Sequence, residues 1–197
     1  PAGEAASQLV AHTFNHLIRR SLQQQLHTTA TDYESLLRDT VVTLSRRIYE
    51  HSQRVEALKQ MGATLVAALF QDNLVHVVHL GDSRAYLLRR NHFLQLTLDH
   101  SAGSRLSLFG AKSPLLMDEP EVERLLLQHM GMMETAKPDV RTIELEPGDR
   151  LLVCSDGLSG VVDDRTIGLT LSQRLSPEET CDALMQVSLD AGGPDNI

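Results

Sequence analysis

The first sixty residues carry apolar side chains at helical spacing. Residues 5–25 contain no glycine or proline, and their large apolar residues recur on one helical face. The polar stretch 27–32 predicts a break, with Asp32 as a candidate N-cap for a second helix over about residues 33–60. Two long antiparallel helices are the simplest arrangement for this part of the chain.

The period changes at Met61, where short aliphatic or β-branched runs begin. Four strands are predicted at residues 64–70, 74–80, 85–89 and 93–97. Short turns separate them, which is typical of a meander within one sheet. Strands resume at 140–145 and 150–154, around a Pro147-Gly148 pair that suits the centre of a type II turn.

Residues 100–138 are less regular, because glycines and prolines interrupt them, and only 121–129 is predicted to be helical. We interpret 100–138 as a flap or insertion that borders the functional site. A final helix is predicted from Ser176, whose Ser-Pro-Glu-Glu sequence forms a capping box, to about Leu189. Long helices, then strands, then mixed elements predict an α+β fold with largely antiparallel pairing.

Composition excludes several functional classes. The chain has 197 residues, with 18 Lys and Arg against 26 Asp and Glu, so its net charge is −8. This balance disfavours nucleic-acid binding, which requires clustered positive charge. No apolar run approaches the roughly 20 residues of a membrane span, and no signal peptide is visible. Only Cys154 and Cys181 occur, which favours a reducing, cytoplasmic setting over a disulfide scaffold.

Three aspartates stand near glycines where predicted elements end. They are Asp82 after Gly81, Asp156 before Gly157, and Asp195 after Gly192-Gly193-Pro194. Carboxylates at strand ends are rigidly aimed, and a neighbouring glycine lets backbone or ligand approach closely. Their hard oxygens suit Mg²⁺ or Mn²⁺. Each aspartate alone is more often a turn residue, so the metal hypothesis depends on all three together.

Two histidine pairs are weaker metal candidates. His12 and His16 lie one helical turn apart, but Thr13 stands where an HExxH motif requires glutamate, which favours a solvated helix face. His76 and His79 are three residues apart on a predicted strand, and odd spacing places them on opposite faces of the sheet.

Nucleophilic catalysis by the chain itself is also disfavoured. Cys154 ends an apolar strand and is interpreted as a buried structural thiol. Ser83 and Ser155 lack the strand–turn–helix context of a nucleophile elbow. The sequence contains no phosphate-binding P-loop and no dinucleotide fingerprint.

Several segments, in order and at suitable spacing, resemble the metal-dependent protein phosphatases of the 2C type, the PPM family. They are GDSRAY at 81–86 with Leu96-Thr97 and Asp99-His100-Ser101 after it, PGDRLLVCSDGLSG at 147–160, and GGPDNI at 192–197. Residues 61–65, MGATL, resemble the strand before the first of these segments. The clear matches cover about half of the chain, and four motifs in register are far more specific than any one.

The resemblance implies a fold of two stacked antiparallel β-sheets flanked by helices, an α-β-β-α sandwich. It implies hydrolysis of phosphoserine and phosphothreonine in proteins with two Mn²⁺ or Mg²⁺ ions. By this resemblance Asp156 and Asp195 are ligands of the binuclear centre, and Asp82 with Asp156 holds a third, looser ion. Gly157 gives the backbone room beside Asp156. No covalent intermediate is needed, because a metal-activated water attacks phosphorus.

The chain departs from the family at both ends. It lacks the family's first Asp-Gly-x-Gly-Gly motif, whose Asp bridges both metals, and it lacks the last strand. We therefore expect one incomplete catalytic domain over 1–197 that is weakly active or inactive by itself. Its expected partner is a phosphorylated protein, the substrate of a serine/threonine kinase. The alternatives are a non-catalytic module that binds a phosphoprotein, and a phosphatase acting in bacterial stress-factor partner switching.

Overall fold

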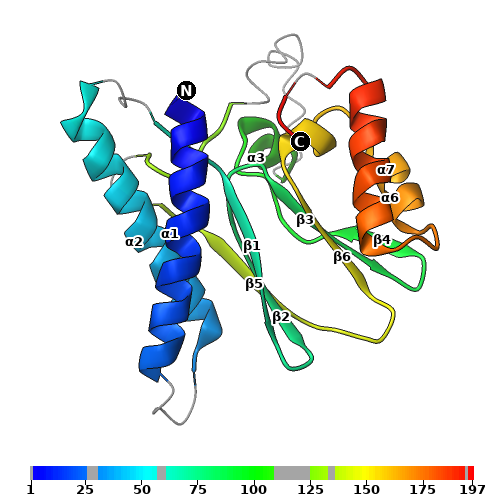
Figure 1. Cartoon of the computed structure of the whole chain (residues 1–197), viewed down its shortest axis with the longest axis horizontal. Coiled ribbons are helices and arrows are strands. Elements are labelled where there is room, and N and C mark those ends of the chain that lie inside the picture. Colours follow the sequence, from blue (N-terminus) through cyan, green and yellow to red (C-terminus); the bar gives the residue numbers. More distant parts are fainter. Residues whose placement is uncertain (1, 26–30, 57–60, 109–124, 133–135, 194) are drawn as a thin grey trace.

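Two three-stranded antiparallel sheets lie face to face between two sets of helices in the computed structural model (Figure 1). The structure describes residues 2–25, 31–56, 61–108, 125–132, 136–193 and 195–197. The first sheet has the order β1-β2-β5, and the second has the order β4-β3-β6. The strands are β1 Leu65–Gln71, β2 Leu74–Leu80, β3 Arg84–Arg89, β4 His92–Gln95, β5 Asp139–Glu144 and β6 Arg150–Cys154. The α-β-β-α sandwich implied by the resemblance is confirmed.

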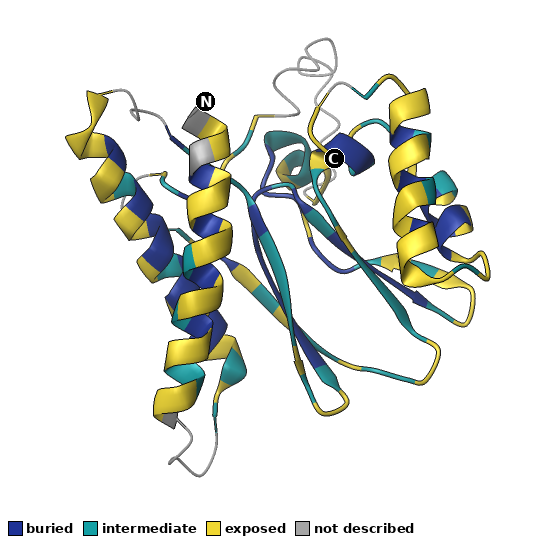
Figure 2. Ribbon diagram, viewed as in Figure 1, coloured by how far each residue is buried: buried dark blue, intermediate teal, exposed yellow. Residues whose placement is uncertain are grey.

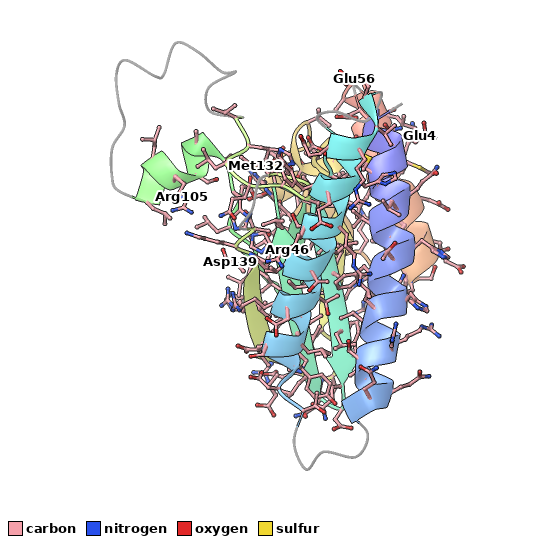
Figure 3. All side chains as sticks on the ribbon, turned by 90° about the vertical axis from the view of Figure 1, so that its left-hand side faces the viewer. Glu4, Arg46, Glu56, Arg105, Met132 and Asp139 are labelled. Atoms are coloured by element: carbon pink, nitrogen blue, oxygen red, sulfur yellow. The ribbon has the colours of Figure 1, made fainter. Side chains whose placement is uncertain are left out.

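Two long helices, α1 (Ala2–Gln25) and α2 (Tyr33–Arg54), cover the outer face of the first sheet. Figure 3 shows them side by side along their length. Asp32 caps α2 as predicted, since its carboxylate accepts a hydrogen bond from the Ser35 amide at 3.1 Å. The helix ends at Arg54, earlier than predicted, and residues 57–60 lie outside the described part of the chain.

The strand β2 is buried on both faces, which explains its continuous apolar sequence (Figure 2). Val78 and Leu80 pack against the helices, while Val75 and Val77 face the second sheet. Between the sheets they meet Ala85, Leu87 and Leu96. This layer of aliphatic side chains joins the two sheets, as the low aromatic content requires.

The prediction of a single meander is wrong. Strands β1 and β2 pair in the first sheet, but β3 and β4 pair in the second. The chain crosses between the sheets at residues 81–83. Gly81 makes this possible: its φ is +121°, and a Cβ there would lie 2.4 Å from Cγ2 of Thr64. Short turn residues indicate where a strand ends, but they do not indicate whether the next strand joins the same sheet.

Helices α5 (Asp156–Ser159), α6 (Asp164–Leu171) and α7 (Pro177–Asp190) follow β6, and α6 and α7 cover the second sheet. The capping box at Ser176 is confirmed, with its hydroxyl accepting from the Glu179 amide and the Glu179 carboxylate accepting from the Ser176 amide. The turn before β6 has Gly148 at φ +92°, as a type II turn requires. Helices α5 and α6 are too short to produce a clear periodic signal and were not predicted.

The segment 100–138 differs from its prediction. A short helix, α3 (Ala102–Leu108), was not predicted. The predicted helix at 121–129 is wrong where it is described, because residues 125–129 are not helical and Leu126 makes an antiparallel bridge to Ser101. Met130, which follows this segment, bridges to Ala63. Met130 is buried in the core under α2 rather than in a flap. Residues 109–124 and 133–135 lie outside the described ranges.

Among the described helices, none combines the length and the apolar character that a membrane span would require.

Replacing the buried Leu44 of α2 by alanine should destabilise the protein by about 2–5 kcal/mol, because it leaves a cavity beneath the helices. Leu169 of α6 is 59% exposed, and Leu169→Ala, the matched control, should cost less than about 1 kcal/mol. Urea unfolding of both variants measures the difference. Equal losses would contradict the assignment of this core.

Candidate metal centre

The first sheet-to-sheet crossing and the end of β6 meet at one edge of the second sheet. Strands β3 and β6 are antiparallel, and Arg84 at the start of β3 pairs with Cys154 at the end of β6. Asp82, two residues before Arg84, and Asp156, two residues after Cys154, therefore leave the sheet on the same side. Both line a cleft of about 630 Å³, and Asp195 lines the same cleft. The structure thus brings the three predicted aspartates to one place.

Asp195 reaches the cleft because the chain end packs against the start of α5. The Ser155 hydroxyl donates to the Asn196 carbonyl at 3.1 Å. A Cβ on Gly157 would lie only 2.2 Å from that same carbonyl oxygen, so any side chain at 157 would displace Asn196. The predicted room beside Asp156 is occupied by the backbone that follows Asp195. Gly157 is fixed in turn by the buried Ser188, whose hydroxyl donates to its carbonyl at 2.7 Å.

The carboxylates of the cleft repel one another. Burial raises the pKa of Asp82 above its ordinary value, and the nearby charge of Asp156 raises it further. A divalent cation would offset this repulsion, and carboxylate oxygens are the ligands that Mg²⁺ and Mn²⁺ prefer. The donor chemistry of Asp82, Asp156 and Asp195 therefore suits such an ion.

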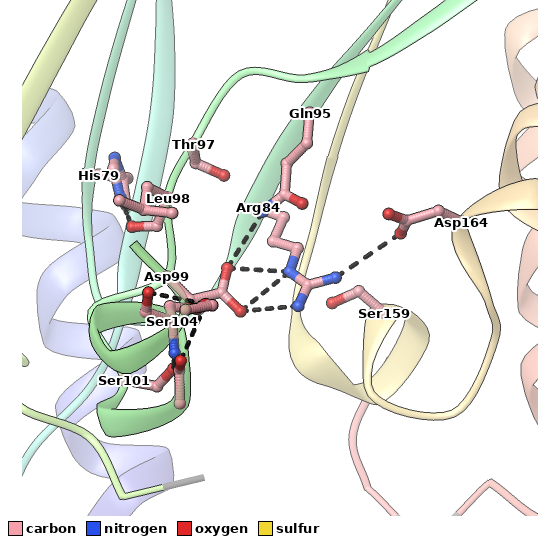
Figure 4. Close-up of polar contacts among 12 residues, drawn as sticks. His79, Arg84, Gln95, Thr97, Leu98, Asp99, Ser101, Ser104, Ser159 and Asp164 are labelled. Carbon is pink, nitrogen blue, oxygen red and sulfur yellow. Dashed lines mark hydrogen bonds and ion pairs between the residues drawn. The ribbon is translucent and has the colours of Figure 1, made fainter. Parts of the chain in front are cut away.

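A partly buried ion pair borders the cleft (Figure 4). Arg84 donates to both oxygens of Asp99, from Nε to Oδ1 at 2.9 Å and from NH2 to Oδ2 at 2.7 Å. Its NH1 donates to the Tyr86 hydroxyl at 3.1 Å, and that hydroxyl donates to Asp164 at 2.9 Å. Gln95 also donates to Asp99. Bidentate pairing of this kind fixes the position and orientation of the guanidinium.

A second cluster lies behind the cleft and contains His79, His100 and Asp139. Donor atoms of the three residues lie within 4.8 Å of one another, the one such trio found in the described residues. The two imidazole rings stack with centroids 4.6 Å apart, and His100 Nε2 lies 3.1 Å from Asp139 Oδ2. His100 Nδ1 accepts a hydrogen bond from the Gly81 amide, so its proton is on Nε2. No lone pair on His100 is then free for a metal. His79 is bonded to the Leu98 carbonyl and contacts His100 only by stacking, so the cluster has a structural role.

The weaker candidates behave as the sequence indicated. His12 and His16 are exposed on α1. His76 stacks on Tyr33 of α2, whereas His79 stacks on His100, so the two lie on opposite faces of β2. Cys154 is partly rather than fully buried, and this burial raises its pKa to about 11, which leaves the thiol protonated and unsuited to nucleophilic attack.

Sequence reasoning assigned no role to Arg84, Asp99 or His100, although all three lie in the segments that carry the family resemblance. Their partners are 15 to 39 residues away, and no local periodicity indicates such pairings. From the segment predicted to be a flap, Ser101, Gly103, Ser104 and Leu126 line the cleft. A covering role for the rest of that segment stays a prediction.

Comparison with known proteins gives one consistent result. The family described as "Protein phosphatase 2C" matches residues 1–193. The serine/threonine phosphatase stp of Listeria monocytogenes is 30% identical over 197 residues, which cover the whole of this chain and 77% of that protein. The serine/threonine protein phosphatase PstP of Mycobacterium tuberculosis is 34% identical over 203 residues and is matched over 36% of its length.

Solved structures agree with these relatives. The crystal structure of the M. tuberculosis phosphatase PstP/Ppp superposes with a TM-score of 0.83 at 34% identity, covering 99% of this chain and 79% of that chain. A crystal structure of the PstP catalytic domain in complex with two manganese ions gives a TM-score of 0.81, with coverage of 99% and 78%. The likeness extends over both sheets and both sets of helices.

The substitution Gly157→Ala tests how Asp195 is positioned. Its Cβ would collide with the Asn196 carbonyl, so Asp195 should move and Mn²⁺ binding should weaken by about tenfold or more. Gly3→Ala, where a Cβ meets nothing within 4 Å, is the matched control and should bind Mn²⁺ normally. Titration of the full-length protein with Mn²⁺ measures both. Unchanged affinity in Gly157→Ala would show that Asp195 does not depend on this contact.

The pH dependence of stability should reflect His79. Burial lowers its pKa below the ordinary 6.5, so the unfolded chain binds more protons than the folded chain between pH 6.5 and the folded pKa. The contribution of His79 is therefore complete above about pH 6.5 and is lost as the pH falls through that window. The raised pKa of Asp82 acts with the opposite sign, since its contribution is lost as pH rises.

A His79→Gln variant isolates the histidine contribution, because glutamine can still donate to the Leu98 carbonyl but does not titrate. Urea unfolding at pH 7.5 and at pH 5.5 should show a smaller decrease in this variant than in the natural protein. The same decrease in both proteins would assign the pH dependence to other groups.

Proposed function

Since the chain belongs to the protein phosphatase 2C family, we propose that it hydrolyses phosphoserine and phosphothreonine in proteins with divalent metal ions held by Asp82, Asp156 and Asp195. One observation carries this proposal. Asp82, Asp156 and Asp195 span 113 residues of the chain, yet all three line one cleft at the edge of the second sheet. A structure that had only retained the fold would have no reason to gather repelling carboxylates.

The proposed roles follow from the resemblance to the family. Asp156 and Asp195 contribute to the binuclear centre, and Asp82 with Asp156 holds the third, looser ion. When bound, Mn²⁺ or Mg²⁺ supplies an acidified water nucleophile and neutralises charge on the phosphoryl group. The chain's own contribution is to fix Asp82 at the crossing before β3, Asp156 just after β6, and Asp195 in the segment after α7. The cleft has room for a phosphorylated side chain between these carboxylates and Ser101 and Ser104.

Arg84 has a supporting role in this proposal. Its Nε and NH2 groups are taken by Asp99, and its NH1 group donates to Tyr86. Arg84 therefore stabilises the crossing that contains Asp82. It does not present an unpaired cation to a phosphate group.

The substrate is proposed to be a protein phosphorylated by a serine/threonine kinase. A cytoplasmic location is part of the same proposal, and it rests on two free cysteines, Cys154 and Cys181. The alternative of a non-catalytic phosphoprotein-binding module is not favoured, because binding alone does not require three convergent carboxylates. No observation favours a role in partner switching.

Replacing Asp156 by alanine in the full-length protein should reduce Mn²⁺-dependent hydrolysis of a phosphothreonine peptide by about 10²–10³-fold or more. The lost carboxylate removes several kcal/mol of transition-state charge stabilisation. Folding should survive, since removing one of several like charges relieves repulsion when no metal is bound. Rates with and without Mn²⁺, together with thermal unfolding, provide the test.

Asp182→Ala is the matched control, because Asp182 is exposed on α7 and does not line the cleft. It should retain the natural rate. Full activity in the Asp156→Ala protein, or no Mn²⁺-dependent hydrolysis by the natural full-length protein, would overturn the catalytic proposal.

A further inference from the structure

We infer that His100 is a positioning residue for the metal ligand Asp82. His100 forms two hydrogen bonds, here called the Gly81 clamp, to the backbone of Gly81, the residue before Asp82, and a third to Asp139 of β5. The inference rests on the proposed function, because it requires Asp82 to bind a metal ion.

The clamp consists of two hydrogen bonds between the same two residues. The His100 amide donates to the Gly81 carbonyl at 2.9 Å, and the Gly81 amide donates to His100 Nδ1 at 3.2 Å. The backbone N–H and C=O of Gly81 are thus both hydrogen-bonded to His100, which lies 19 positions away in the sequence. The contact is buried, with only 5% of the His100 side chain exposed. Hydrogen bonds sheltered from water in this way are worth more than exposed ones.

The far side of the imidazole is fixed as well. Because Nδ1 accepts from an amide, the ring proton is on Nε2, and Nε2 donates to Asp139 Oδ2 at 3.1 Å. Asp139 begins β5 of the first sheet, and its side chain is 63% exposed. His79 stacks against the ring from β2. The imidazole therefore connects the crossing at Gly81 to the sheet that the chain has just left.

Gly81 requires such an external restraint. Glycine has no Cβ and populates many backbone conformations, so its own φ of +121° is not fixed by local sterics. The residues after it are restrained by other partners. The Ser83 hydroxyl bonds to that of Thr64 at 2.7 Å, and Arg84 pairs with Asp99. The consecutive residues Asp99 and His100 thus hold Arg84 and Gly81, one on each side of Asp82.

The geometry makes a distinction that substitutions can test. Asparagine at position 100 places an oxygen near the position of Nδ1 and can accept from the Gly81 amide. Glutamine places its polar group near Nε2, so it can reach Asp139 but leaves the Gly81 amide without its acceptor. The two amide side chains are similar in polarity and charge, so the difference between them reports the bond to Gly81.

The experiment measures Mn²⁺ binding to the metal-free full-length protein by the loss of the free-ion signal in electron paramagnetic resonance. His100→Gln should weaken the looser Mn²⁺ site by about tenfold or more, as is usual when a group that orients a ligand is removed. His100→Asn should retain affinity within about threefold of the natural protein. His79→Gln, also buried in this cluster, leaves the Gly81 clamp intact and should bind Mn²⁺ normally.

Two results would overturn the inference: natural Mn²⁺ affinity in His100→Gln, or equal weakening in His100→Asn and His100→Gln. Thermal unfolding of each variant separates loss of metal binding from loss of the fold. If His100→Gln does not fold, the variant Asp139→Ala provides the test. Asp139 is exposed, so its replacement should not unfold the protein, and it leaves His100 Nε2 without an acceptor. It should weaken Mn²⁺ binding severalfold with little change in unfolding temperature, and natural affinity there would overturn the inference.

Asp82→Asn in the same titration separates this inference from the proposed function. Weak binding in Asp82→Asn with natural binding in His100→Gln rejects only the positioning role. Natural binding in Asp82→Asn rejects Asp82 as a ligand, and the positioning role fails with it.

Discussion

The pairing of Arg84 with Cys154 determines where the functional groups of this protein can lie. It aligns the start of β3 with the end of β6, so the residues just outside the strands emerge together at one edge of the sheet. A shift of one residue in this register would turn the inward-facing Ala85 and Leu87 away from the other sheet. The aliphatic layer between the sheets therefore fixes the register, and the register brings Asp82 and Asp156 to one cleft.

The same arrangement has an electrostatic cost that the surrounding polar contacts offset. Burial and then the nearby charge of Asp156 raise the pKa of Asp82, so the cleft disfavours the charged form of this carboxylate. The charge of Arg84 offsets only part of this effect at Asp82, because Asp99 occupies its guanidinium. Rigid contacts instead prevent the carboxylates from relaxing apart: the Gly81 clamp, the Arg84–Asp99 pair and the Asn196 backbone against Gly157. Cation binding therefore stabilises the folded protein, because only the folded state presents the convergent carboxylates.

Local sequence patterns predicted much of this structure, and they failed where long-range contacts determine the conformation or the strand pairing. The stripe on α2, the exact bounds of β2 and β6 and the capping box at Ser176 all follow from periodicity or capping chemistry, which act within a few residues. The meander failed because the destination of β3 depends on packing between sheets. The predicted helix at 121–129 failed because Leu126 pairs with Ser101, a partner 25 residues distant. The aspartates were found through their glycine neighbours, whereas His100 offered no comparable local signal.

Because long-range contacts shape the site, four short motifs in register are informative when each motif alone is not. An Asp beside a Gly is a common turn, and the fold contains turns without catalytic meaning, such as the one at Gly148. Beside Asp82 and Asp156, by contrast, the glycine has a neighbour that excludes a side chain: Thr64 at Gly81 and the Asn196 carbonyl at Gly157. Those neighbours come from segments distant in the chain. These two motifs are therefore informative together with the segments that contact them, Gly81 with Thr64 and Gly157 with the backbone that follows Asp195.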